Sequence, residues 1–228
     1  MIQGIVIQGP TNYFTDIIPS YANIPNVVFS TWSDEPKENI EQIKSYGITV
    51  LQSDKPKFSG NLNVNLQSYS SLVGIRYLKE KKVDEILKVR GDLKINNVSL
   101  LLKILESRQI SFLSICKQNV RPLNYYLGYQ HSWFDFPCDF MIYGKTIEIE
   151  KCFNFQINNH AEIPPESLIA YSYCVQSKIK FELNYSHFIK NNMSFFARDC
   201  IKNNITVYWL KHNREYIPEI SDSVFYEC

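Results

Sequence analysis

The chain has 228 residues, a length that fits one domain or one domain with a small appendage. Hydrophobic residues make up 45% of it, which is ordinary for a folded protein with a substantial core and excludes a disordered chain. The 24 basic and 23 acidic residues leave a net charge of +1, which argues against a generally basic nucleic-acid-binding protein. We therefore expect a globular protein with no nucleic-acid partner.

No run of apolar residues is long enough to cross a bilayer, and residues 1–5 lack the basic and apolar regions of a signal peptide. The expected compartment is therefore the cytoplasm. The six cysteines form no C-x-x-C pair and match no structural zinc spacing, so we interpret them as buried or incidental thiols.

Apolar segments in the first half each end in polar or turn-forming residues, which predicts a series of strands. We expect strands at 2–7, 26–32, 48–51, 85–89 and 110–115. Helical composition or spacing predicts helices at 15–21, 38–46, 63–82 and 97–107. Gly47 is a candidate helix cap, and Gly74 inside the long helix indicates close packing. Strands that alternate with helices predict an α/β fold with a largely parallel sheet and helices on both faces.

Right-handed crossovers place the ends of the first four strands along one edge of this sheet. Those ends fall at Gly9, Thr31, Ser53 and Asp92. Ligands of open α/β sheets bind at such an edge, so we expect the binding site there. Asp92 interrupts an apolar strand that then resumes, and a carboxylate at that position is well placed to hold a divalent cation, because hard cations take oxygen ligands.

After Lys117 the composition changes. Residues 121–144 are rich in aromatic side chains, and residues 136–144 have the pattern of a loop that leads into a strand. A helix is predicted over 166–175, with Pro165 suited to its first turn, and a strand over 207–210. The sequence shows no internal repeat and no linker, so it indicates no firm domain boundary.

Several short segments match, in order, the pattern of a known family. They are Ile5–Pro10, Phe29–Trp32, Ser53–Pro56, Asn63–Gln67 with Ser70 and Gly74, Leu87–Asp92, Phe136–Gly144 and Pro165-Glu166. The ordered set, which spans residues 2 to 170, resembles the WavE family of lipopolysaccharide-synthesis glycosyltransferases. The family pattern usually has an arginine where this chain has Leu66. The last part of the chain matches no family pattern.

The resemblance implies a GT-A-like fold: a Rossmann-like, mostly parallel sheet flanked by helices, with a smaller C-terminal α+β appendage. It implies one catalytic domain over 1–228, with a nucleotide-sugar-binding half at 1–117 and an acceptor-binding half at 118–228. The implied reaction moves a sugar from a nucleotide-sugar donor to a bacterial lipopolysaccharide, lipooligosaccharide or capsule glycan.

In this interpretation Asp92 coordinates Mg or Mn, which bridges the two donor phosphates. The alternative is that Asp92 is only a turn residue or a helix cap. Arg90 either pairs with phosphate through its planar guanidinium or forms a salt bridge with Asp92. Contacts with the rest of the donor are predicted for Gln8, Gly9, Pro10, Thr31, Trp32, Asp54 and Asn65. Each of these also has a purely structural interpretation, as a tight turn, a packing residue or part of a capped helix start.

Asp139 is the candidate general base, because an inverting transferase needs a carboxylate to take the proton of the acceptor hydroxyl. Asp135 is a nearby rival. Glu166 is a further candidate, although an acidic residue at a helix start is also favourable for the helix alone. The aromatic side chains of residues 125–143 form either a platform for sugar rings or part of the core.

A glycolipid acceptor would make the protein a peripheral protein of the inner membrane. Basic residues in the last third that suit such a contact are Lys178, Lys180, Lys190, Lys202, Lys211 and Arg214.

Two other functions stay open. A sugar nucleotidyltransferase uses a related sheet but usually has a Gly-rich basic loop after its first strand, which residues 8–11 lack. A non-catalytic module that binds a glycan or a partner is the third possibility.

Overall fold

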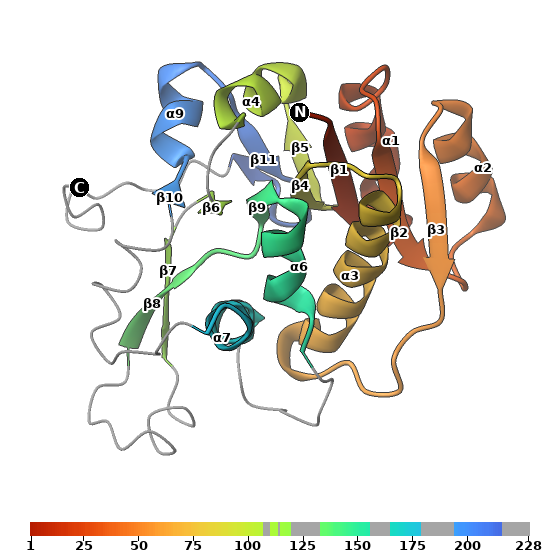
Figure 1. Cartoon of the computed structure of the whole chain (residues 1–228). Helices are drawn as coiled ribbons and strands as arrows, with labels where there is room; N and C mark the ends of the chain where they lie inside the picture. The colour runs from red at the N-terminus through yellow and green to blue at the C-terminus, as the bar shows by residue number, and fades with distance from the viewer. Residues whose placement is uncertain (107–109, 114, 120–132, 156–164, 179–193, 216–228) are drawn as a thin grey trace.

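A computed structural model of the protein describes residues 1–106, 110–113, 115–119, 133–155, 165–178 and 194–215. Its centre is a seven-stranded sheet with the strand order β10-β6-β9-β4-β1-β2-β3 (Figure 1). The strands of this sheet are β1 (Gln3–Gln8), β2 (Val27–Trp32), β3 (Thr49–Ser53), β4 (Glu85–Arg90), β6 (Ser111–Phe112), β9 (Met141–Lys145) and β10 (Ser194–Phe195). The run β4-β1-β2-β3 is parallel throughout, whereas β9 is antiparallel to both β4 and β6.

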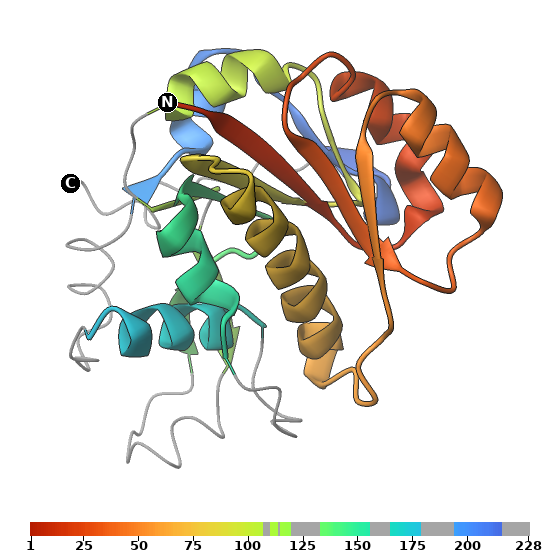
Figure 2. The ribbon, with the colours of Figure 1, turned by 45° about the vertical axis from the view of Figure 1, so that its right-hand side comes forward.

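Helices cover both faces of the sheet. One face carries α3 (Val64–Glu80), α6 (Thr146–Phe153) and α7 (Pro165–Gln176), and Figure 2 shows α3 lying across this face. The opposite face carries α1 (Phe14–Ile17), α2 (Lys37–Ser45), α4 (Val98–Leu105) and α9 (Ala197–Lys202). Single turns of 3-10 helix are η1 (Thr11–Tyr13), η2 (Ile18–Ser20), η3 (Asn61–Asn63) and η4 (Leu210–His212).

The strand β1 shows why two helical layers are needed. Its side chains alternate, so that Ile5 and Ile7 enter the core on the α1 and α4 side while Val6 enters the core on the α3 side. All three are fully buried. A strand that is apolar on both faces is stable only where both faces are covered, which is typical of parallel sheets.

Two small sheets extend this core. Strand β11 (Val207–Trp209) pairs with β5 (Leu93–Ile95) and with β12 (Arg214–Glu215), and β7 (Ile115–Asn119) pairs with β8 (Trp133–Pro137). The main-chain N–H of Leu210 donates to the carbonyl oxygen of Asp92 at 3.0 Å. The chain near residue 209 therefore lies beside the end of β4.

The predicted α/β class, with a mostly parallel sheet flanked by helices, is confirmed. The predicted strand at 110–115 is wrong in detail, because β6 and β7 are separate strands and β6 joins the sheet in the antiparallel direction to β9. Helices α6 and α9 were not predicted. The sequence of α6, TIEIEKCF, alternates polar and apolar residues and so resembles a strand.

Both glycine predictions are confirmed. Gly47 ends α2 with a φ of +77°, a backbone conformation that favours glycine. A Cβ at Gly74 would lie 2.5 Å from Cγ1 of Val6, so α3 can approach β1 closely only because this residue has no side chain.

Among the described residues, no helix combines the length and the apolar character needed to span a bilayer. Cys138, Cys152, Cys174 and Cys200 are buried, as the composition predicted. Burial raises the pKa of the Cys174 thiol to about 12 and that of the Cys152 thiol well above its usual range. These two thiols are therefore poor nucleophiles.

Candidate functional site

The strand order reverses between β1 and β4. From β1 the chain continues to β2 and β3 on one side, and it later returns to β4 on the other side. The carboxyl ends of β1 and β4 are in register, with Gln8 opposite Arg90, and the N–H of Gly91 donates to the carbonyl oxygen of Gln8 at 2.7 Å. Such a reversal leaves a crevice outside the strand ends, which is where open α/β sheets bind ligands.

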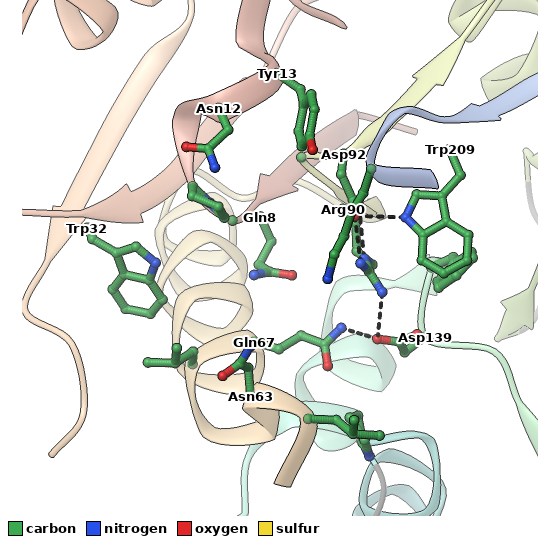
Figure 3. Close-up of a pocket in the computed structure, with 18 of the residues that line it drawn as sticks. Gln8, Asn12, Tyr13, Trp32, Asn63, Gln67, Arg90, Asp92, Asp139 and Trp209 are labelled. Atoms are coloured by element: carbon green, nitrogen blue, oxygen red, sulfur yellow. Dashed lines mark hydrogen bonds and ion pairs between the residues drawn. The ribbon is translucent and has the colours of Figure 1, made fainter. Parts of the chain in front are cut away.

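A pocket of about 690 Å³ opens at this point (Figure 3). Its volume is within the range of small-molecule sites in proteins. Side chains and backbone from β1, β2, β4, α3, α7, the residues before β9 and the β11–η4 segment line it. They are Gln8, Gly9, Pro10, Asn12, Tyr13, Trp32, Glu35, Lys55, Leu62, Asn63, Leu66, Gln67, Arg90, Gly91, Asp92, Asp139, Phe140, Pro165, Glu166, Trp209, Lys211 and His212.

Arg90 is the central charge of the pocket. Its Nε and one terminal nitrogen donate to the two carboxylate oxygens of Asp92 at 3.0 and 2.7 Å, and its other terminal nitrogen lies 4.0 Å from Oδ2 of Asp139. The guanidinium also lies over the rings of Phe140 and Trp209, 4.7 and 5.5 Å from their centroids. A charge-assisted fork between two aromatic rings has little rotational freedom, so the position of this cation is well defined.

Asp92 is held as firmly as Arg90. Besides the two Arg90 bonds, its Oδ2 accepts a hydrogen bond from Nε1 of Trp209 at 2.9 Å. Burial alone raises the pKa of Asp92, but the Arg90 charge and the hydrogen bonds from Arg90 and Trp209 outweigh burial. The pKa of Asp92 therefore lies below its ordinary value, and the carboxylate is ionised at neutral pH.

Asp139 lies just before β9, and only 2% of its surface is exposed. Nε2 of Gln67, from the first turns of α3, donates to Oδ2 of Asp139, and Nζ of Lys88 donates to the main-chain oxygen of Asp139 at 2.7 Å. Asp139 is thus tied to α3 through its side chain, as Figure 3 shows, and to β4 through its backbone.

Lys88 is an unusual residue for the middle of a buried strand. It is fully buried, and its ammonium lies 5.6 Å from the centre of the Phe153 ring. Burial lowers the pKa of Lys88 to about 8, although the Asp139 charge opposes this shift. A buried lysine beside a buried carboxylate indicates a site where charge is retained at a cost to stability.

The other end of the pocket is formed by β2 and η1. Trp32 and Tyr13 contribute ring surface, and the exposed side chain of Asn12 presents both donors and an acceptor. Glu35 accepts hydrogen bonds from the N–H and the hydroxyl of Thr11 at 3.0 and 2.5 Å, which fixes the loop after β1. Figure 3 shows Trp32 and Asn12 on the opposite side of the pocket from Asp139.

Most of the predicted site residues meet in this pocket. The lining includes Gln8, Gly9, Pro10, Trp32, Arg90, Asp92, Asp139 and Glu166. Of the four predicted strand ends, Gly9 and Asp92 line the pocket, whereas Thr31 and Ser53 do not. For Arg90, the predicted salt bridge with Asp92 is present.

Three predicted donor contacts do not line the pocket. Thr31 is fully buried in β2, because the side chain of every second strand residue points into the core. Asp54 is exposed and accepts a hydrogen bond from the Ser33 hydroxyl at 2.5 Å, as expected for a turn residue. Asn65 donates to the carbonyl oxygen of Phe58 at 3.1 Å and so stabilises the loop before α3.

Gln67, Trp209, Tyr13 and Glu35 line the pocket but were not predicted to do so. Gln67 lies one turn after Asn63 on α3, so its helical spacing from a predicted helix start was a usable signal. Trp209 gave no local signal, because its partner Asp92 is 117 residues away in sequence. The side chain of Asp135 and most of the aromatic segment 125–143 lie outside the described residues, as do Lys180 and Lys190.

The lining suits a cation that binds together with a phosphate group of the ligand. It suits less well a metal ion that is held by protein side chains alone. The described residues contain no cluster of three or more His, Cys, Asp or Glu side chains suited to a metal. Oδ1 of Asp92 accepts one hydrogen bond and keeps a second lone pair. Mg²⁺ is often held by one or two carboxylates together with substrate phosphates, and Asp92 fits that role.

Comparisons with known proteins give only weak likenesses. No protein-family model matches the chain, and no curated protein matches it. A cytidylyltransferase from Leptospira borgpetersenii is 15% identical, with 78% of this chain and 73% of that chain covered and a TM-score of 0.42. A putative glucose-1-phosphate thymidylyltransferase from Bacillus anthracis, in complex with a sucrose, is 7% identical, with 86% of both chains covered and a TM-score of 0.45.

The WbbM bifunctional glycosyltransferase is 10% identical, with 85% of this chain covered and a TM-score of 0.47. The match covers 38% of that larger chain. At such identities and TM-scores the likenesses do not identify the reaction, which has to be argued from the pocket itself.

Proposed function

We propose that this protein is a glycosyltransferase that takes its sugar from a nucleotide-sugar donor. The observation that carries the proposal is the pocket at the strand reversal, where the ends of β1 and β4 bring Gln8, Gly9, Arg90 and Asp92 together with the buried Asp139. The likeness of the sequence to lipopolysaccharide-synthesis glycosyltransferases supports the same reaction class. It also suggests the acceptor: a lipopolysaccharide, lipooligosaccharide or capsule glycan, reached by peripheral contact with the inner membrane.

In the proposed complex the donor phosphates lie at the β4 end, next to Arg90. The lining holds three permanent cations, Lys55, Arg90 and Lys211, against the four carboxylates of Glu35, Asp92, Asp139 and Glu166. A diphosphate would add further negative charge to a lining that is already close to neutral, so an additional cation is needed. Asp92 would hold Mg or Mn there, and the metal would offset the charge that develops on the leaving group.

The chemical step is a substitution at the anomeric carbon of the donor sugar. The oxygen of an acceptor hydroxyl forms a bond to that carbon, and the bond from the carbon to the phosphate oxygen breaks, so the nucleotide leaves with the electron pair. In an inverting reaction a carboxylate accepts the proton of the attacking hydroxyl, and we assign this role to Asp139, with Glu166 as the second carboxylate of the pocket. Asp139 is buried between Gln67 and Arg90, and these contacts support a fixed position for the base.

A sugar nucleotidyltransferase would use the same edge of the sheet. Against this alternative, the segment after β1 is Gly9, Pro10 and the η1 turn Thr11–Tyr13, which has no basic residue to hold a triphosphate. The two activities give different products. A nucleotidyltransferase consumes a nucleoside triphosphate and a sugar phosphate, whereas a glycosyltransferase releases a free nucleotide from a nucleotide-sugar.

The direct test is thermal stabilisation of the purified protein by UDP, GDP, CMP, CDP and ADP, each with Mn²⁺ and with EDTA. We expect one nucleotide to raise Tm clearly in Mn²⁺ and the Asp92→Ala variant to lose that increase. Asp16→Ala, an exposed carboxylate on α1, is the matched control and should respond like the wild type. No shift with any nucleotide would reject the proposal in favour of a non-catalytic module, and a shift that persists in EDTA would remove the metal role of Asp92.

A further inference from the structure

The floor of the pocket is short of hydrogen-bond donors. Oδ1 of Asp139, Oε1 of Gln67 and Oε1 of Gln8 are buried, and none of the three accepts a hydrogen bond from the described residues. Each side chain is more than nine-tenths buried, and all three line the pocket. A buried acceptor without a donor is destabilising, and three such acceptors around one pocket indicate that a ligand with donor groups satisfies them.

The chemistry of Gln67 fixes its orientation. Its Nε2 donates to Oδ2 of Asp139, and turning the amide over would place an oxygen against the carboxylate. Its Oε1 must therefore face away from Asp139 and stay an acceptor. The same bond, together with the Arg90 guanidinium 4.0 Å away, commits Oδ2 of Asp139 and leaves Oδ1 as the oxygen that still needs a donor.

Acceptors of this kind repel the diphosphate of a nucleotide-sugar, whose oxygens are all acceptors at neutral pH. They are suited to a ligand with several O–H donors, and a sugar ring is such a ligand. The neighbouring Arg90 is suited to the opposite chemistry, because its guanidinium has only donors. The β4 end of the pocket is therefore divided into a position for an anion and a position for hydroxyl groups.

We propose that these acceptors form a subsite for sugar hydroxyls, in which Oε1 of Gln67 accepts from a hydroxyl of the donor sugar and Oδ1 of Asp139 accepts from the acceptor hydroxyl that it deprotonates. Gln67 is then both a specificity-determining residue and the positioning residue for Asp139. Gln8 supplies a further acceptor from β1. This inference rests on the proposed function for the identity of the ligand, but the subsite itself is defined by the three buried acceptors.

The first arm of the test does not require a nucleotide. Saturation-transfer NMR is recorded with a panel of monosaccharides and their deoxy analogues, on wild type, Gln67→Met and Gln42→Met. Gln42 is an exposed residue of α2 and provides the matched control. We expect saturation transfer to at least one sugar in wild type and in the control, loss of it when one hydroxyl of that sugar is removed, and loss of it in Gln67→Met.

The second arm measures the Kd of a nucleoside diphosphate and of the matching nucleotide-sugar by calorimetry, with Mn²⁺ present. Wild type should bind the nucleotide-sugar more tightly than the nucleoside diphosphate, by about tenfold for each hydrogen bond that the sugar makes. Gln67→Met should lose this preference while its Kd for the diphosphate changes less than twofold. The inference would be overturned if Gln67→Met kept the preference, or if it raised the Kd of both ligands by the same factor.

The two arms separate the possible failures. Nucleotide binding without any role for Gln67 rejects the subsite and leaves the proposed function in place. Sugar binding that depends on Gln67, without nucleotide binding, keeps the subsite and rejects the transferase. Absence of sugar binding in wild type in both arms rejects the subsite.

The Tm and near-UV circular dichroism of Gln67→Met show whether the variant is folded. Gln67→Asn, which keeps the amide on a shorter side chain, gives a second variant.

Discussion

The two ends of the pocket are built in different ways. At the β4 end, Arg90 is bonded to Asp92 and lies beside Asp139, and further bonds arrive from Gln67 on α3 and Trp209 on β11. At the β2 end, hydrogen bonds such as those between Glu35 and Thr11 shape the loop and leave Asn12 exposed. A rigid set of charges suits the reacting groups, whose positions must not change, whereas a more open polar surface suits recognition.

The largest effect that this comparison predicts is at Arg90. Arg90→Met leaves the buried Asp139 and the partly buried Asp92 without their shared cation, so the free energy of unfolding in urea should fall by about 3–5 kcal/mol. Arg76→Met provides the control, because Arg76 is half-exposed and its ion pair with Glu150 is at the surface, where a loss of less than about 1 kcal/mol is expected. Equal losses in the two variants would show that the β4 end is not a tightly coupled unit.

The next effect is a pH dependence that comes from Lys88. Its pKa is about 8 in the folded protein and near 10.5 in a free side chain, so between these values the unfolded chain binds more protons. Stability should therefore rise as pH increases from 8 to 10.5, by up to about 3 kcal/mol from this group alone. The raised thiol pKa values of Cys152 and Cys174 act in the opposite direction above pH 9, so the informative quantity is a difference between variants. In urea unfolding, the free energy of unfolding of wild type minus that of Lys88→Met should rise over this pH range, whereas the difference between wild type and the exposed control Lys103→Met should stay constant. Parallel curves for wild type and Lys88→Met would contradict the burial of a charged lysine.

The strand ends were predictable because each is a local event: an apolar run stops and polar residues follow. The places of Gln8 and Arg90 could be inferred in this way, and the parallel topology then brought them together. The partners of these residues could not be inferred, because Gln67 and Asp139 are 72 residues apart and are joined only by the antiparallel return of β9. Helix α6 was missed for a related reason, since burial against α3 and α7 outweighs its strand-like alternation.

A smaller effect is predicted at Gly74, which sets the height of α3 above β1 and β2. A Cβ there would come within 2.5 Å of Val6, so Gly74→Ala should lower stability by about 1–3 kcal/mol despite the better helix propensity of alanine. Because α3 carries Gln67, the substitution should also weaken sugar-dependent binding more than binding of the nucleotide alone. Calorimetry on the folded variant measures both, and unchanged stability would show that the helix can shift without cost.

The smallest effect is expected at the β2 end. Asn12→Ala should leave Tm within about 1 °C of wild type, because Asn12 is exposed. The substitution should raise the Kd of the preferred nucleotide by about fivefold, which is the loss expected for one hydrogen bond. Competition between nucleotides with different bases tests this directly. A variant that binds every nucleotide as wild type does would show that Asn12 makes no contact with the nucleotide.

In the proposed function, the pocket at the β1–β4 reversal cleaves the bond between a sugar and a nucleotide. The most direct measurement is mass spectrometry of the products formed from a panel of nucleotide-sugars with Mn²⁺, for wild type, Asp139→Asn and the exposed control Asp16→Asn. We predict release of a free nucleotide from one donor class in wild type and control, with a loss of about 100-fold or more in Asp139→Asn. No release from any donor, or formation of a nucleoside triphosphate when pyrophosphate is added, would contradict the proposal.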